Sequence, residues 1–264
     1  MRLYFQVAKN TWDEMATYRF NFVMWRIRNV LQLLTVYYLW FAVTPQNGQI
    51  FGYSRPLILT YVLGATLVGS IVFSTRTQEM GDNINNGELS QFLIRPFQYL
   101  GYWFARDIGD KLFNVSFAFG ELAIFLLILH PTLYLQSNGA FLFLAVVSIL
   151  IAVVINFFIG SLLGMIAFWS PEVWAPRFIF MTLVSFFAGG LFPLDILPLT
   201  LQRIFSLLPF SYLGYFPLAI YLGKLSFLQI GQGFSIAVVW SILLYVLVSV
   251  VWRKGLKMYS SEGN

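Results

Sequence analysis

Side chains that could carry out catalysis are few in this chain of 264 residues. No GxxxxGK(S/T) phosphate-binding loop is present, because the one Gly-Lys pair, Gly223–Lys224, lacks the upstream glycine and is followed by Leu225. That loop is what cradles the phosphates of ATP, so we expect no ATP hydrolysis by this chain. There is no cysteine, and the one histidine, His130, predicts no metal site. GxSxG and HExxH motifs are also missing, which disfavours an intramembrane enzyme.

One acidic residue lies deep within an apolar segment. Glu121 falls near the middle of a predicted membrane helix over residues 111–129, roughly 15 Å from either end at the rise of an α-helix. A charge at that depth costs on the order of 3 kcal/mol unless it is paired or hydrated. Two interpretations stay open. Glu121 is either a protonated or hydrogen-bonded contact between helices, or a group that lines a translocation path or its gate.

The longest polar stretch, residues 75–110, contains a second feature of interest over residues 82–96, which read DNINNGELSQFLIRP. Asp82 and the asparagines after it can cap the start of a helix, and Pro96 can stop one. Gly87 allows a sharp change of chain direction that a residue with a Cβ would resist. The pattern predicts a short helix outside the membrane.

This predicted helix is amphipathic. Leu89, Phe92 and Leu93 would share one apolar face. The face could cover the membrane interface, or it could dock into a groove of a partner protein. In the second case the charged side chains would form the polar rim that is usual at interfaces. That rim would consist of Asp82, Glu88 and Arg95.

The elements that must position these residues are membrane helices. Hydrophobic residues make up 59% of the chain and charged residues 10%, whereas a soluble domain carries about 25% charged residues. We predict an all-α integral membrane protein whose residues 1–264 form one transmembrane domain, in which a crossing takes about 20 apolar residues. The six expected spans are 27–43, 56–74, 111–129, 139–168, 176–189 and 234–252.

Two further segments do not read as spans. Residues 3–25 place polar and apolar side chains on opposite helical faces, which predicts an amphipathic helix lying in the membrane interface. Residues 191–233 hold apolar runs of only about 10–14 residues, too short to cross, and we expect an outer re-entrant helical hairpin buried against protein. The residues that break these runs, and that we expect at an outer gate, are Gly189, Gly190, Pro193, Pro198, Pro209 and Pro217.

The basic residues predict the orientation. Of the 16 Lys and Arg residues, the six-span arrangement puts only Arg55, Arg203 and Lys224 on the side opposite the termini. The positive-inside rule therefore predicts that both termini are cytoplasmic. Because the net charge of +5 follows this topology, it does not indicate a nucleic-acid partner.

The order of these segments resembles the permease subunits of type-2 ATP-binding-cassette exporters, in particular the uncharacterised and drug-resistance branch. The pattern Gly87-x-Leu89-x-x-x-Leu93-x-x-Pro96 between the second and third spans is similar to the coupling loop of that family. The stretch from Ala188 to Pro198, followed by two further Pro-containing turns before residue 218, is similar to its outer re-entrant region. The likeness covers nearly the whole chain.

This resemblance implies a bacterial cytoplasmic-membrane complex of two permeases and two cytoplasmic ATPases, with ATP and Mg bound in the ATPases and no cofactor in this chain. It implies that the loop 82–96 contacts the ATPase, and that the second permease is the same chain or a different homologous one. Lipid-linked glycan, lipid, hydrophobic drug and peptide all remain open as cargo. The alternatives are a channel or secondary carrier, which needs ionisable groups along a path, and a scaffold that transports nothing.

Overall fold

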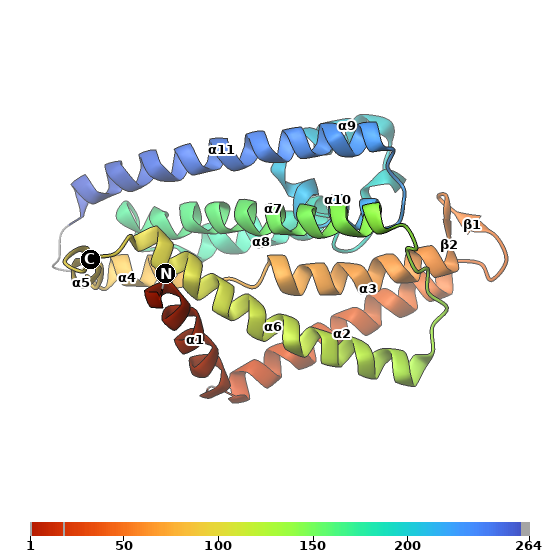
Figure 1. Ribbon diagram of the computed structural model, residues 1–264, viewed down its shortest axis with the longest axis horizontal. Helices are drawn as coiled ribbons and strands as arrows, with labels where there is room; N and C mark the ends of the chain where they lie inside the picture. Colours follow the sequence, from red (N-terminus) through yellow and green to blue (C-terminus); the bar gives the residue numbers. More distant parts are fainter. Residues whose placement is uncertain (1, 18, 260–264) are drawn as a thin grey trace.

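Long helices make up most of the computed structural model, which describes residues 2–17 and 19–259 (Figure 1). Residues 1, 18 and 260–264 lie outside the described residues. The α-helices are α1 Arg2–Thr17, α2 Arg19–Val43, α3 Arg55–Val72, α4 Gln78–Asn85, α5 Leu89–Leu93, α6 Tyr99–Leu129, α7 Gly139–Gly164, α8 Trp174–Phe187, α9 Leu199–Leu207, α10 Tyr215–Tyr221 and α11 Phe227–Met258. Three 3₁₀ turns, η1 Met165–Phe168, η2 Leu194–Ile196 and η3 Pro209–Leu213, and a hairpin of β1 Gln49–Ile50 and β2 Tyr53–Ser54 complete the described part.

Four helices in the described ranges are long and apolar enough to cross a membrane: α3, α6, α7 with its η1 extension, and α11. α2 has 25 residues but carries Arg26, Arg28 and Asn29 near its start, so it is more polar than the four. α8 is apolar but has only 14 residues. At about 1.5 Å per residue it spans about 21 Å, less than the roughly 30 Å of the hydrocarbon core.

The most apolar helix, α7, lies at the centre and packs against α11, α10, α3 and α4. Its polar side chains are satisfied internally, as lipid or an apolar core requires. Ser148 donates to the carbonyl of Ala145 at 2.7 Å, and Asn156 donates to the carbonyl of Val72, the last residue of α3, at 2.7 Å. The second of these bonds joins α7 to the end of α3.

The first predicted element differs from the structure. The expected single helix over residues 3–25 is wrong, because α1 ends at Thr17 and α2 begins at Arg19. The two helices meet at an angle (Figure 1). α1 crosses α6 closely at Gly109, where an added Cβ would collide with the backbone carbonyl of Ala8. A small residue at such a crossing lets two backbones approach, so the contact with α6 turns α1 away from the line of α2.

The two ends of the molecule carry different elements (Figure 1). α4, α5 and the end of α11 lie at one end, and the β-hairpin, α9 and α10 lie towards the other. α10 is buried against α7 and α3, whereas α9 exposes Leu199, Ile204 and Leu207. The third predicted span also begins earlier than expected, since α6 starts at Tyr99 rather than at residue 111.

Candidate functional site

The predicted coupling segment is two short helices rather than one. α4 ends at Asn85 and α5 begins at Leu89, and Gly87 between them has a φ of +73°. This left-handed conformation favours glycine, which has no Cβ to clash, as the sequence predicts for Gly87. The Tyr259 hydroxyl, at the end of α11, donates to the Gly87 carbonyl at 2.7 Å and accepts from the Ser90 amide at 3.1 Å. The turn is therefore tied to the last membrane helix.

The expectation that Leu89, Phe92 and Leu93 form one exposed apolar face is wrong. Leu89 is fully buried in the same apolar cluster as Met80 and Trp103. The Phe92 ring is half-buried against an aromatic cluster, with centroid separations of 5.1 to 6.5 Å. That cluster consists of Phe97, Tyr99, Tyr102 and Trp103. The chain changes direction at Gly87, so the apolar face of α5 packs against α6 and is not exposed to solvent.

The exposed apolar surface of this segment lies instead at its C-terminal end. Leu93 is 48% exposed and Ile94 is 86% exposed, and Arg95 and Pro96 after them are exposed as well. We call residues 93–96 the coupling tip. Asp82 and Glu88 are also exposed, as a polar rim requires. Ile94 was missed because the helical pattern of α5 ends before it, although an apolar residue beside Arg-Pro in a polar loop was a signal.

α4 packs directly against α7. Met80 and Ile84 are buried against the C-terminal part of α7 and η1. A Cβ added at Gly164 would lie 2.7 Å from the carbonyl oxygen of Thr77, just before α4. The Asn85 side chain donates to the carbonyl of Pro171, beyond η1, at 3.0 Å. Such close packing transmits displacement because packed interiors are stiff.

A second connection runs through a network of partly buried charges. The Arg76 guanidinium contacts Asp110 at 2.9 Å and Glu79 at 2.5 Å, and Arg106 contacts Glu79 at 3.0 Å and Glu14 at 2.7 Å. Glu14 belongs to α1, Arg106 and Asp110 belong to α6, and Glu79 belongs to α4. Arg76 lies just before α4. Burial works against the charged form of Arg76, yet Glu79 and Asp110 together raise its pKa above the ordinary value. We call these five residues the ion network.

The ion network continues into the interior at the end of α3. Lys111 lies 3.2 Å from Asp107 and donates to the carbonyl of Val72 at 3.0 Å, and also to that of Ser74. Asp107 is fully buried and accepts from the Arg76 amide at 3.3 Å. A cation at a helix C-terminus satisfies the carbonyls that have no partner in the helix. Buried charges persist only when paired in this way, so α3, α6 and the coupling segment are held as one unit.

Glu121 is paired as well. The Arg26 guanidinium donates from Nε to Oε1 of Glu121 at 2.5 Å, and from Nη2 to Oε2. Arg26 is 8% and Glu121 20% exposed, at a groove of about 290 Å³ between α2 and α6. Sequence reasoning placed Arg26 just outside the first span and saw no partner for Glu121. The structure makes the pair a contact between two helices, a bidentate geometry that suits guanidinium and carboxylate.

The outer residues named from the sequence fall into buried and exposed groups. Gly189 has a φ of +77°, and its carbonyl accepts from the Tyr61 hydroxyl at 2.6 Å. The turn after α8 is thereby fastened to α3. Gly189, Pro193, Pro209 and Pro217 are buried, while Gly190 and Pro198 are exposed.

A polar cluster that the sequence did not reveal lies beside this turn. The Tyr53 hydroxyl donates to both carboxylate oxygens of Asp195, at 2.8 and 2.9 Å. Lys224 places Nζ 3.9 Å from the Tyr53 ring centroid and donates to the carbonyl of Gly52 at 2.6 Å. Burial raises the pKa of the Asp195 carboxyl, while the Tyr53 hydrogen bond and Lys224 oppose the shift. A lone acid within the apolar run 191–197 was the available signal. We call Tyr53, Asp195 and Lys224 the outer cluster.

Within the described ranges, no group of three His, Cys, Asp or Glu residues could hold a metal ion. The residues instead form a connected set of contacts: a coupling tip whose segment is anchored to α7 and α11, and an ion network that reaches α1 and α6 and continues to the end of α3.

The comparison with protein families agrees with this arrangement. The family model described as "ABC-2 family transporter protein" matches residues 30–263. The chain belongs to the ABC-2 transporter family. This ABC-2 permease is a multi-pass membrane protein, and permeases of the family work with ATPase subunits that supply the catalysis. The match begins after α1, so α1 is not part of it. No curated protein matches the chain.

Proposed function

We propose that this chain is the permease subunit of an ATP-driven exporter. It moves an amphipathic or hydrophobic substrate out of the cytoplasm or the inner leaflet. The energy comes from two cytoplasmic ATPase subunits, and a second permease, the same or a homologous chain, completes the pathway. The observation that carries this proposal is that the coupling tip is exposed, while the segment 76–87 before it contacts α6, α7 and the end of α11.

In the membrane, α2, α3, α6, α7, α8 and α11 form the six spans of this proposal. Both termini face the cytoplasm of a bacterial cell in this proposal. α4, α5 and the end of α11 share one end of the molecule, and the six-span arrangement assigns all but three of the 16 Lys and Arg residues to the side of the termini. The range 75–110 is then the cytoplasmic coupling region, and residues 191–233 form the outer re-entrant region. The short α8 completes its crossing with the turn at Gly189, whose carbonyl is satisfied by Tyr61.

Coupling proceeds by displacement of packed elements. The ATPases, as they close on ATP, push the coupling tip. α4 passes the movement to α7 through the contact at Gly164, and Arg76 passes it to α6 and, through Glu79, to Arg106 and α1. Buried ion pairs suit this role because they hold a definite geometry, and breaking one is costly.

At the other end, the outer cluster closes the pathway. Asp195 in the re-entrant region accepts hydrogen bonds from Tyr53 in β2 of the β-hairpin. Lys224, just before α11, donates to the Gly52 carbonyl of the same hairpin. Release of the Tyr53–Asp195 contact frees η2 from the hairpin. We place the outer gate here, with Glu121 acting on transport through its pair with Arg26 at the α2–α6 contact.

The experiment is reconstitution with an ATPase. The permease is co-expressed with the ATPase encoded beside it, purified, and placed in vesicles in which ATPase stimulation and ATP-dependent movement of candidate lipids, drugs and peptides are measured. We expect stable co-purification and a stimulating substrate. A permease that associates with no ATPase, or that conducts ions or solutes without ATP, contradicts the proposal.

A further inference from the structure

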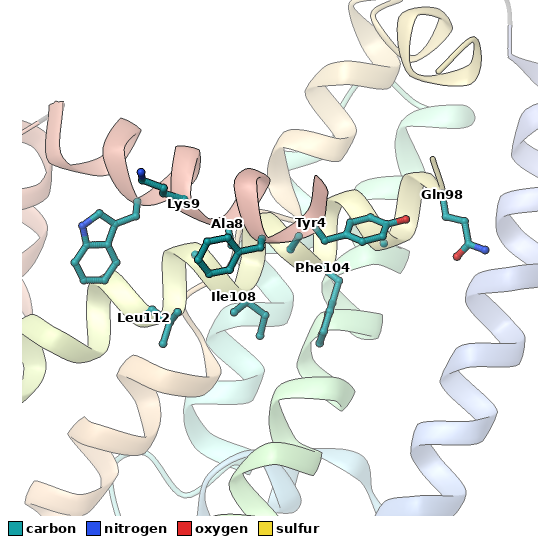
Figure 2. Close-up of a pocket in the computed structure, with 12 residues that line it drawn as sticks. Tyr4, Ala8, Lys9, Gln98, Phe104, Ile108 and Leu112 are labelled. Carbon is teal, nitrogen blue, oxygen red and sulfur yellow. The ribbon is translucent and has the colours of Figure 1, made fainter. Parts of the chain in front are cut away.

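A groove of about 640 Å³ opens between α1 and α6 (Figure 2). This is within the range of about 300–1,000 Å³ that is usual for ligand pockets. In Figure 2, α1 lies above α6 and carries Ala8 and Lys9. The side chains of Phe104, Ile108 and Leu112 extend from α6 below. Phe5 and Trp12 of α1 also line the groove. The wall is thus mainly apolar, which excludes a small polar solute as its ligand.

The polar groups of the groove lie at its edge. Lys9 is exposed at the rim and has neither an ion pair nor a hydrogen bond among the residues that the structure describes. Arg2, seven residues earlier, lies two turns away on the same face of α1. Tyr4 and Gln98 face each other at one end of the groove (Figure 2). The ligand that fits has an apolar body and an anionic head.

We propose that this groove binds one phospholipid of the cytoplasmic leaflet with an anionic headgroup. An amphipathic interfacial helix lies about 5–10 Å into the boundary between headgroups and acyl chains. The space beneath α1 is then at the depth of the acyl chains, and Lys9 is at the depth of the headgroups. One acyl chain lies along Phe104 and Ile108, and the phosphate contacts Lys9.

A second protein chain fits the groove less well. Protein interfaces carry about one hydrogen bond per 100–200 Å² and a polar rim, whereas this groove offers one cation and few hydrogen-bonding groups. The bound lipid would also have a defined effect, because it contacts both α1 and α6 along the groove beside their crossing at Gly109. α1 carries Glu14, which pairs with Arg106 in the ion network. Occupancy therefore holds α1 in the position that the network needs.

The first test is native mass spectrometry of the full chain in detergent, titrated with phosphatidylglycerol and with phosphatidylcholine. We expect one tightly held lipid and a preference of about fivefold for phosphatidylglycerol, the contribution of one lysine at an anionic surface. Lys9→Gln should abolish this preference, and Leu112→Trp, which narrows the groove, should weaken both lipids. Lys257→Gln is the matched control, since this lysine is exposed near the end of α11, and it should bind as the wild type does.

The second test identifies the occupant in native membranes. A photo-reactive benzoylphenylalanine in place of Phe5, an exposed aromatic residue that already lines the groove, is activated by light, and we expect an adduct with the mass of a phospholipid. An adduct with another protein chain or a second copy overturns the proposal. So does an equal affinity of the wild type for the two lipids, or an equal loss in the Lys9 and Lys257 variants. These outcomes do not depend on ATP-driven export.

Discussion

Substitution of Ile94 by Asp should weaken binding of the ATPase without changing the stability of the folded permease. Ile94 is 86% exposed at the coupling tip, so its side chain contacts little of the permease. Surface substitutions of this kind usually change the free energy of unfolding by no more than about 0.5 kcal/mol. We therefore expect Ile94→Asp to leave the thermal stability of the isolated permease unchanged.

The effect on ATPase binding should be large. Full burial of an isoleucine side chain contributes about 1.5–3 kcal/mol. Since 86% of this side chain is still available for burial, docking would contribute about 2 kcal/mol through it. A loss of that size raises the dissociation constant of the ATPase about 30-fold. A carboxylate placed in an apolar contact adds a desolvation cost, so 30-fold is the lower expectation.

Phe92→Ala should behave differently, because the Phe92 ring contacts Tyr102 and Trp103 inside the permease. Removing a fully buried Phe costs about 3–5 kcal/mol, and this half-buried ring should cost about 2 kcal/mol of permease stability. Leu135→Asp is the control, since Leu135 is 77% exposed in the loop at the opposite end. It should change neither quantity.

The assay is titration of the purified ATPase onto the permease in nanodiscs, with thermal unfolding of each permease variant alone. Unchanged ATPase affinity and coupling in Ile94→Asp would refute the assignment of the coupling tip as the docking surface. A stable Phe92→Ala variant would refute the burial argument, independently of docking.

Three further outcomes are expected. Glu121→Gln should lower permease stability by about 2 kcal/mol, less than the roughly 3–5 kcal/mol that breaking a fully buried pair costs. The double variant Arg26→Glu with Glu121→Arg should restore the melting temperature. If the double variant recovers no stability, the pair is not what stabilises this contact. Gly164→Ala should lower the free energy of unfolding of the permease by about 1–3 kcal/mol, because the added methyl group overpacks against the segment before α4. The same variant should show reduced ATP-coupled transport. A variant with unchanged stability and unchanged transport would contradict the importance of this contact. Because the chain has no cysteine, a single cysteine at Asn138 should react with an impermeant thiol reagent outside intact cells and one at Asn86 should not; the reverse pattern would invert the proposed orientation.

Several features were predictable because they depend on local sequence. Long apolar runs predict helices wherever they occur, and α3, α6, α7 and α11 lie where the hydropathy places them. The sharp change of chain direction at Gly87 was predictable for a similar reason, since glycine permits a positive φ. The division of the segment into α4 and α5 was not predicted. The order of these elements also supported the family resemblance that the match over residues 30–263 confirms.

The boundary between α1 and α2 was not predictable in this way. The helical pattern over residues 3–25 continues without an obvious stop, and the change of direction depends on the close approach of α1 to Gly109 of α6. The direction of α5 has the same origin. Leu89 and Phe92 are apolar and were expected at a docking surface, but α6 presents Trp103 and Tyr102 beside them and covers them first.

The sequence by itself determined that this protein crosses the membrane, where its four long apolar helices lie, and that Glu121 needs a partner. Only the tertiary structure decided which partners meet. Arg26 and Glu121 are separated by 95 residues, and Tyr53 and Asp195 by 142. The physical reason is that apolarity and helical propensity belong to each residue and its neighbours, whereas the energy of an ion pair depends on a distance that the packing of whole helices sets.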